Sequence, residues 1–249
     1  MPRLPFLLLA ALLSGASAAA QTTYKLGLRG GANRAITTLG ASGNSPGSYP
    51  FSYSADKSAI YAWQAGAVLE IAFRKFSVQP ALLFSQKGEV FHMQTSHSGV
   101  AGTSRRDTRR TSRVNWLELP VNVVYTVHGV QLSAGPYVAL AVSGRQQSTW
   151  RFISSTPIVG PTESAYGGNI AFDDGSHNRR FDAGVNFNVG YRRGPLQVQL
   201  GYGVGLRNLH QVPAIDFDNV TDPQFNHDFD ADAAYNRVAQ LSATYFLEL

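Results

Sequence analysis

A two-residue periodicity dominates residues 181–207, which read FDAGVNFNVGYRRGPLQVQLGYGVGLR. Apolar side chains occupy every second position from Phe181 to Tyr191, and again from Leu196 to Leu206 after a short break at 192–195. The intervening positions carry mostly Asp, Asn, Gln, Gly and Arg. This alternation predicts two β-strands in a hairpin, because successive side chains of a strand point to opposite faces. It does not say whether the apolar face meets a protein core or lipid.

The same alternation recurs along the chain, in segments whose connections alternate in length. The predicted strands are 24–32, 62–73, 76–91, 114–127, 130–144, 180–192, 196–209 and 236–249. The long connections are 33–61, 91–113, 145–179 and 210–235, and the short turns are 74–75, 128–129 and 193–195. All short turns therefore fall at one end, together with both termini. The layout predicts an all-β fold: an eight-stranded antiparallel up-and-down transmembrane β-barrel with long extracellular loops and short periplasmic turns.

The N-terminal stretch MPRLPFLLLAALLSGASAAA has a basic Arg3, an apolar core and small residues before Gln21. It predicts a cleaved signal peptide at 1–20, followed by one outer membrane β-barrel domain at 21–249. The apolar run is too short for a membrane-spanning helix, which takes about 20 residues. Without Cys, the exported domain has no disulfide framework. Loss of Arg3 lowers the net charge from +5 to +4, a mild excess that does not indicate nucleic acid binding.

The chemistry of the two strand faces favours an outer membrane barrel. The polar parity consists of Gly, Asn, Gln and Ser with an occasional charge, which suits a narrow lumen. Aromatic side chains near the strand ends predict two interfacial belts. They are Tyr61, Trp63, Trp116, Phe181 and Tyr235 at the long-loop end, and Tyr24, Phe73, Phe76, Tyr125, Tyr191 and Tyr245 at the short-turn end. The alternative is a soluble periplasmic barrel of the lipocalin type, which binds a small apolar ligand in an apolar interior.

Charged residues of inward parity predict a lumen charge network. They are Arg29, Glu70, Glu118, Asp182, Arg192 and Arg207. Eight strands leave an interior just wide enough for side chains to fill, so we expect a plugged barrel held by ion pairs. Which acid meets which base is left open.

Three prolines lie inside predicted strands, at Pro80, Pro120 and Pro136. Each removes a donor from the ladder of backbone hydrogen bonds, which predicts bulges or bends at these positions. A parity slip at 82–84, just after Pro80, fits a bulge there.

Six sequence blocks follow one another across nearly the whole mature chain. They are LGLRGGANRA, WQAGAVLEIAFRKFSVQPALLFSQKG, VNWLELPVNVVY, LSAGPYVALAVSG, FDAGVNFNVGY and GYGVGLRNL. In this order they resemble the strand blocks of the PorT-like outer membrane β-barrel domain family. The resemblance implies an eight-stranded barrel in the outer membrane of a Gram-negative cell. Most members have no assigned activity, and the namesake is an accessory of a protein secretion system, so a structural or interaction role at the cell surface is expected.

The chain ends in YFLEL, which places Tyr245, Leu247 and Leu249 on the outward parity. Such an ending is expected of a strand that the barrel assembly machinery recognises, although Leu249 stands where an aromatic residue is more usual. The expected partners are outer membrane lipid, this machinery and other secretion or envelope proteins. A monomer is expected.

Two of the predicted loops carry opposite charge. One contains Arg105, Arg106, Arg109, Arg110 and Arg113. The other, 210–235, contains six Asp residues and neither Lys nor Arg. The arginines could grip phosphates of surface glycolipid, because guanidinium groups bind phosphate in bidentate geometry. They could instead attract the acidic loop, or both loops could simply be solvated.

Catalytic and metal-binding patterns are weak. There is no G-x-S-x-G motif, and the histidines lie mostly in or beside predicted loops, where they are ordinary. The run Asp228-Phe229-Asp230-Ala231-Asp232 opens like a calcium loop but has Ala at the positions of the turn glycine and the bidentate Glu. No enzymatic activity, cofactor or metal is expected.

Overall fold

The computed structural model describes residues 22–38, 40–45, 51–99, 102–155, 160–173, 178–209 and 234–248. The predicted signal peptide lies outside these residues. In the described part of the chain, no helix has the length and apolar character needed to cross a membrane.

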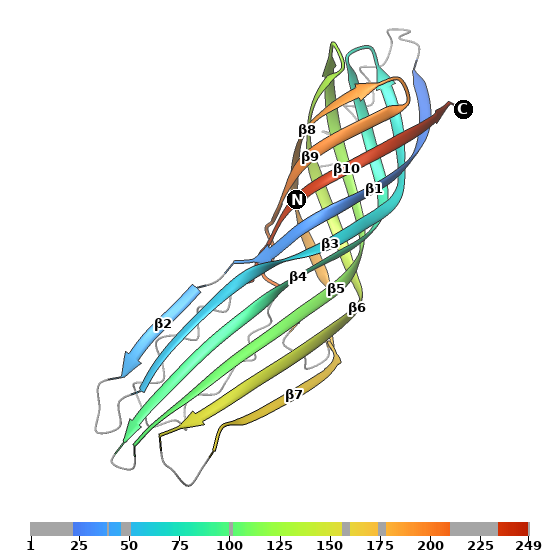
Figure 1. Cartoon of the computed structure of the whole chain (residues 1–249). Coiled ribbons are helices and arrows are strands. Elements are labelled where there is room, and N and C mark those ends of the chain that lie inside the picture. The colour runs from blue at the N-terminus through green and yellow to red at the C-terminus, as the bar shows by residue number, and fades with distance from the viewer. Residues whose placement is uncertain are drawn as a thin grey trace, which may run out of the picture.

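The described residues form one antiparallel sheet, whose first and last ring strands meet (Figure 1). The strands are β1 (Thr23–Thr37), β2 (Gly40–Ser45), β3 (Phe51–Phe73), β4 (Phe76–Gly99), β5 (Gly102–Val127), β6 (Val130–Ser154), β7 (Thr162–Asn169), β8 (Phe181–Arg193), β9 (Leu196–Gly205) and β10 (Asn236–Glu248). The order β1-β10-β9-β8-β6-β5-β4-β3 closes because β3 pairs with β1 again. The eight-stranded antiparallel ring is therefore as the alternation predicts.

The register of the ring gives it the tilt of a barrel. A row of paired residues that leaves β1 at Arg34 passes through every ring strand and returns to β1 at Tyr24, ten residues lower. A stagger of this size over eight strands corresponds to strands inclined by about 40° to the barrel axis. Every strand of the ring is thus paired on both sides, and the ring has no open edge.

Three of the four predicted long loops are largely strand, which corrects the sequence prediction. β3, β4, β5 and β6 are 23, 24, 26 and 25 residues long, and they run far beyond the ring. Together with β2 and β7 at the edges they form an open sheet, hereafter the projecting sheet (Figure 1). The polar composition of these segments gives no strand signal, because a strand with polar side chains on both faces shows no apolar alternation. Most of the fourth predicted loop lies outside the described residues.

The three short turns lie together at the other end of the ring, as predicted. Arg74, His128 and Gly129 adopt positive φ values of 53°, 50° and 85°, and Gly194 has a φ of 60°. Positive φ at both central residues, as at His128-Gly129, is the geometry of a two-residue turn whose twist matches that of the flanking strands.

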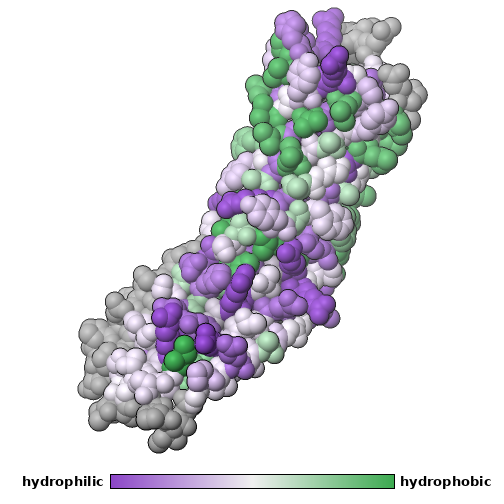
Figure 2. All heavy atoms as spheres, viewed as in Figure 1, coloured by the Kyte–Doolittle hydropathy of each residue, from purple (hydrophilic) through white to green (hydrophobic). Residues whose placement is uncertain are grey.

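Apolar side chains lie on the outside of the ring, part of which Figure 2 shows in green. Polar side chains fill its inside. Outward residues such as Leu28 and Leu200 are 64% and 60% exposed, whereas inward Glu118 and Asp182 are 1% and 0% exposed. Trp116 departs from the predicted belt, because it is buried against Tyr137, Ala139 and Ala141. Its inward position follows from strand parity, since the adjacent Leu117 faces outward.

The pairing irregularities do not lie at the prolines. Register shifts occur between Ala59 and Gln64 and between Asn115 and Trp116. The β4–β5 register is the same on both sides of Pro80, and Leu83 is buried in the lumen with Val68, Ala81 and Phe246. The predicted bulge after Pro80 is therefore wrong: the lumen accepts apolar Leu83 on the polar parity.

Candidate functional site

The lumen contains layers of polar and charged side chains, beginning near the short turns with an ion pair. Arg192 of β8 donates through Nη1 to Oε2 of Glu70 on β3. Gln79 Nε2 donates to the other carboxylate oxygen at 3.0 Å, and Ser77 Oγ donates to it at 3.3 Å. The Arg192 guanidinium also lies 4.5 Å from the centre of the Phe246 ring. Two of the predicted lumen residues thus pair directly.

Arg29 occupies the next layer and is held by neutral acceptors. Its Nε donates to Thr244 Oγ1 at 2.9 Å and its Nη2 to Gln199 Oε1 at 3.1 Å. The side chain is buried, and it makes no ion pair with any described carboxylate. The structure therefore does not bring Arg29 to any of the predicted acidic partners.

Glu118 pairs with Lys87, a residue that sequence reasoning missed. Lys87 Nζ lies 2.7 Å from Glu118 Oε2, and both side chains are 2% exposed. The ammonium also lies 4.7 Å from the centre of the Tyr137 ring. The signal was available, because Lys87 shares a parity with Gln79 and Ser85, but a parity slip at 82–84 interrupts that pattern.

Asp182 is reached through Tyr137 rather than through an arginine. Tyr137 Oη donates to Asp182 Oδ2 at 3.1 Å, and Asn236 Nδ2 donates to the same oxygen at 2.7 Å. Lys87, Tyr137 and Asp182 therefore form a continuous chain of contacts across β4, β6 and β8. Together with Glu118 and Asn236, this group is called the upper lumen cluster.

The end of the lumen nearest the projecting sheet is closed by a further ion pair and by apolar side chains. Lys57 Nζ lies 3.1 Å from Glu89 Oε2, and Thr37 hydrogen bonds to the same carboxylate. Phe172 and Leu209, which lie outside the strands, pack on the buried cluster around Trp116. A side chain at Gly144 would clash with Ile170 and Phe172, so glycine allows the segment at 170–172 to approach the inner face. The interior is thus packed from the turns to this end.

Arg207 does not belong to the lumen network. It follows the end of β9, and its guanidinium lies 4.9 Å from the centre of the Phe181 ring. Phe181 alternates with the buried Asp182 and Gly184 and so belongs to the outer face. The strand parity used to place Arg207 does not extend to it, because β9 ends at Gly205.

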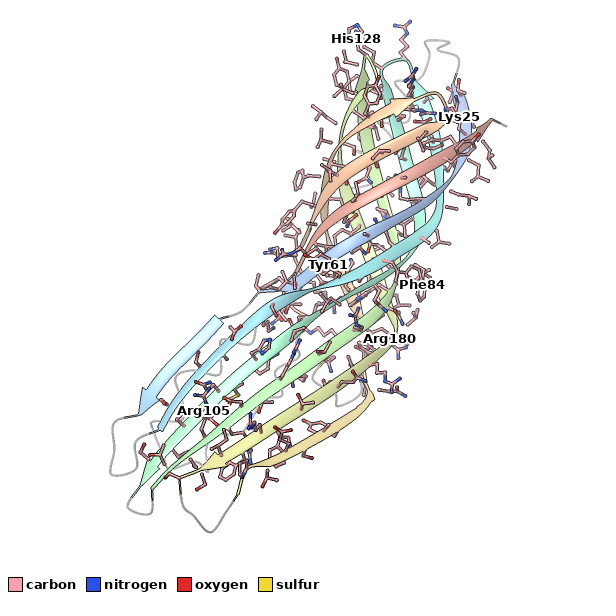
Figure 3. All side chains as sticks on the ribbon, in the orientation of Figure 1. Lys25, Tyr61, Phe84, Arg105, His128 and Arg180 are labelled. Carbon is pink, nitrogen blue, oxygen red and sulfur yellow. The ribbon has the colours of Figure 1, made fainter. Side chains whose placement is uncertain are left out.

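The five clustered arginines lie on β5 and not in a loop, and they divide between its two faces. Arg106 stacks on Trp150 and Arg110 on Phe91, with distances of 5.2 and 5.0 Å to the ring centres. Arg105, Arg109 and Arg113 alternate with them and share the opposite face. Figure 3 shows Arg105 far out on the projecting sheet. The predicted acidic partner segment lies mostly outside the described residues, as does the calcium-like run at 228–232.

No set of three or more His, Cys, Asp or Glu side chains that could hold a metal ion occurs in the described ranges.

The ring, its inverted polarity and its filled lumen agree with what a comparison of families finds. The model described as "Outer membrane protein beta-barrel domain" matches residues 19–211. The chain belongs to this family. For an outer membrane barrel, the outward apolar side chains contact lipid and the polar interior is the lumen. A soluble ligand-binding barrel requires the inverse arrangement, so the lipocalin-like alternative does not fit.

Solved structures similar to this barrel protein include other outer membrane proteins. Neisserial surface protein A is 8% identical over 89% of this chain and 96% of its own, with a TM-score of 0.28. The translocator domain of autotransporter NalP from Neisseria meningitidis is 8% identical over 97% and 94%, with a TM-score of 0.19. OccK3 of Pseudomonas aeruginosa is 10% identical over 92% and 96%, with a TM-score of 0.18. Such values support no conclusion about function. Comparison with curated proteins gives no match.

Proposed function

We propose that this outer membrane barrel is a closed anchor that holds the projecting sheet at the cell surface, where the sheet interacts with other envelope components. The observation that carries the proposal is the packed lumen. Six of its charges are neutralised inside the protein, by the pairs Glu70–Arg192, Lys87–Glu118 and Lys57–Glu89. Arg29 and Asp182 are held by neutral hydrogen-bond partners. A barrel built this way serves as a support and not as a channel.

The size and the exposure of the projecting sheet support an interaction role. A membrane-spanning strand needs about 9–11 residues, whereas β4 and β5 have 24 and 26. The outer parts of both strands carry polar and basic side chains on two faces. At one edge, β7 pairs only with β6 in the described part of the chain, so its other side offers free backbone groups. Unpaired strand edges are surfaces to which other chains can add.

A more specific form of this proposal is an accessory role in protein secretion. It rests on the resemblance of six sequence blocks to the PorT-like family, and it would make a secretion component the partner of the projecting sheet. The barrel would be exported by its signal peptide and inserted by the barrel assembly machinery, which would read β10 with its outward Tyr245 and Leu247. Catalysis is not part of the proposal.

Conductance measurements test whether the barrel is closed. The purified chain, reconstituted in planar bilayers, should show no steady large pore, and proteoliposomes should exclude solutes of sugar size. A general porin reconstituted in parallel provides the positive control, and a shift in gel mobility on heating shows that the barrel is folded. Steady porin-like conductance from folded protein would overturn the proposal.

A further inference from the structure

Outward arginines mark the end of the apolar wall nearest the projecting sheet. Beyond this end, an arginine lies on or next to six of the eight ring strands. These residues, called the arginine band, are Arg34 of β1, Arg113 of β5, Arg145 of β6, Arg180 before β8, Arg207 after β9 and Arg237 of β10. Figure 3 shows Arg180 near the level of Tyr61 and Phe84, where the ring gives way to the projecting sheet.

Arg113 and Arg145 lie directly opposite each other in the β5–β6 register. Directly opposed like charges destabilise a sheet unless something neutralises them. Arg113 Nη1 donates to Tyr61 O at 3.0 Å and to Gln86 Oε1 at 3.1 Å, both of which are uncharged acceptors. The Arg145 side chain makes no hydrogen bond or ion pair with the described residues. Two exposed guanidinium groups therefore stand side by side without a described carboxylate.

Two arginines farther out on the same face, Arg105 and Arg151, are neutralised by the chain itself. Arg105 Nε lies 3.0 Å from Asp107 Oδ1, and Arg151 Nε lies 3.2 Å from Glu163 Oε1. Within the arginine band, Arg180 has a carboxylate partner, because its Nε lies 3.8 Å from Asp173 Oδ2. Charge compensation is thus present at Arg105 and Arg151 and missing at Arg113 and Arg145. The difference indicates that the anion at this edge comes from outside the protein.

The surroundings of the pair match the head group region of a lipid. Closer to the short turns on the same strands, Leu117 and Leu140 are paired and face outward. Between these leucines and the arginines lies a polar ladder, in which Gln86 donates to Asn115 at 3.1 Å and Asn115 donates to Ser143 at 2.9 Å. An amphiphile could therefore place acyl chains on the leucines and an anionic head group on the arginines.

We propose that Arg113 and Arg145 bind the phosphate groups of a glycolipid in the outer leaflet, and that the rest of the arginine band continues this contact around the barrel. Guanidinium groups suit this partner because their planar forks bind phosphate in bidentate geometry and stay charged at all physiological pH values. The proposal rests on the orientation given above, with the projecting sheet outside the cell.

Binding of fluorescent lipid A to the full chain in dodecyl maltoside micelles tests the proposal. The parent should bind lipid A that carries both phosphates, bind dephosphorylated lipid A much more weakly, and lose affinity as salt is raised. The double variant Arg113→Gln, Arg145→Gln should weaken binding by about tenfold or more, a change of about 1.4 kcal/mol or more, because it removes the charged donors to the lipid phosphates. Inorganic phosphate at low millimolar concentration should not displace the lipid, since it lacks acyl chains.

The double variant Arg105→Gln, Arg151→Gln is the matched control, because it removes two positive charges from the same face. It should bind lipid A like the parent. Equal loss in both double variants, or loss in the control alone, would overturn the assignment, as would equal binding of dephosphorylated lipid. Displacement by inorganic phosphate would overturn the lipid as partner. Heat-modifiable gel mobility shows that each variant is folded, and because the assay needs neither cells nor conductance, its failure leaves the closed-anchor proposal intact.

Discussion

Lys87 and Glu118 show how the lumen tolerates charge. Removing an ion from water costs several kcal/mol in a protein interior, and a close opposite charge offsets this cost. The two groups are 2.7 Å apart at 2% exposure, and Lys87 gains further stabilisation from the face of the Tyr137 ring. The pair is therefore stable only as a unit, and each partner alone would be an uncompensated buried charge.

Replacing Glu118 with Ala should lower the free energy of unfolding by about 3–5 kcal/mol, because Lys87 is left buried and unpaired. Urea titration of the barrel in micelles, followed by tryptophan fluorescence and heat-modifiable mobility, measures the change. Adding Lys87→Met to Glu118→Met should recover most of the loss, since the double change removes both charges and keeps the volume filled.

Glu163→Ala is the matched control for this measurement. Glu163 also pairs with a basic residue, Arg151, but both side chains are more than half exposed. Exposed pairs contribute less than about 1 kcal/mol. If Glu118→Ala proved as mild as Glu163→Ala, Lys87 would have to be compensated by another group, and the account of the upper lumen cluster would be wrong.

At the scale of elements, β4 and β5 each consist of a part that belongs to the ring and a part that belongs to the projecting sheet. Near the turns they belong to the ring, where one face meets lipid and the other the lumen. Beyond the ring, both faces carry polar side chains, and the pairing continues to Gly99 and Gly102 at the tip. The outer parts add backbone pairing to one another, but they close no part of the ring.

A variant in which residues 92–109 are replaced by Asn-Gly should therefore still form the barrel. Phe91 and Arg110 are paired, and a two-residue turn can join them. The shortened protein should remain heat-modifiable and remain in the outer membrane fraction after a carbonate wash. In intact cells, a photo-cross-linking probe at Thr95 of the parent should capture the protein partners of the projecting sheet. A probe at Arg110 of the shortened protein should not capture these partners.

A single substitution inside the ring provides the contrast. A Cβ at Gly135 would lie 1.9 Å from Val121 O, and only a movement of the backbone could relieve this clash. Gly135→Val should therefore impair folding more than the loss of the whole outer hairpin does. A shortened hairpin that fails to fold would show that the projecting sheet is needed to assemble the ring.

For the whole molecule, the two ends of the barrel differ in kind. One end has three two-residue turns, and the other continues into the projecting sheet (Figure 1). Outer membrane barrels have short turns toward the periplasm and longer segments toward the exterior. The projecting sheet is therefore expected to be outside the cell.

Cysteine labelling should report this orientation directly, because the chain contains no Cys. Ser98→Cys, near the tip of β4, should react in intact cells with a maleimide that does not cross membranes. His128→Cys, in a short turn, should react only after the outer membrane is permeabilised. Labelling of His128→Cys alone in intact cells would mean that the barrel is inserted in the opposite direction.

Sequence alternation by itself determined the ring strands, the polar lumen and the apolar wall. Glu70 and Asp182 were placed inside because each follows the polar parity of a strand whose other face is apolar. Strand parity also places Trp116 inside, although an aromatic residue near a strand end is typical of an interfacial belt. A period of two is a local property, so no partner strand is needed to recognise it.

Only the tertiary structure decided which charges meet and how far the strands extend. Lys87 and Glu118 come together because β4 pairs with β5 and the register of this pairing places the two side chains within reach. The register depends on every turn and bulge around the ring. Arg105 and Arg113 were placed in a loop because a strand with polar side chains on both faces lacks the contrast that reveals a strand. Backbone pairing with neighbouring strands, which leaves no trace in the local sequence, makes that segment β5.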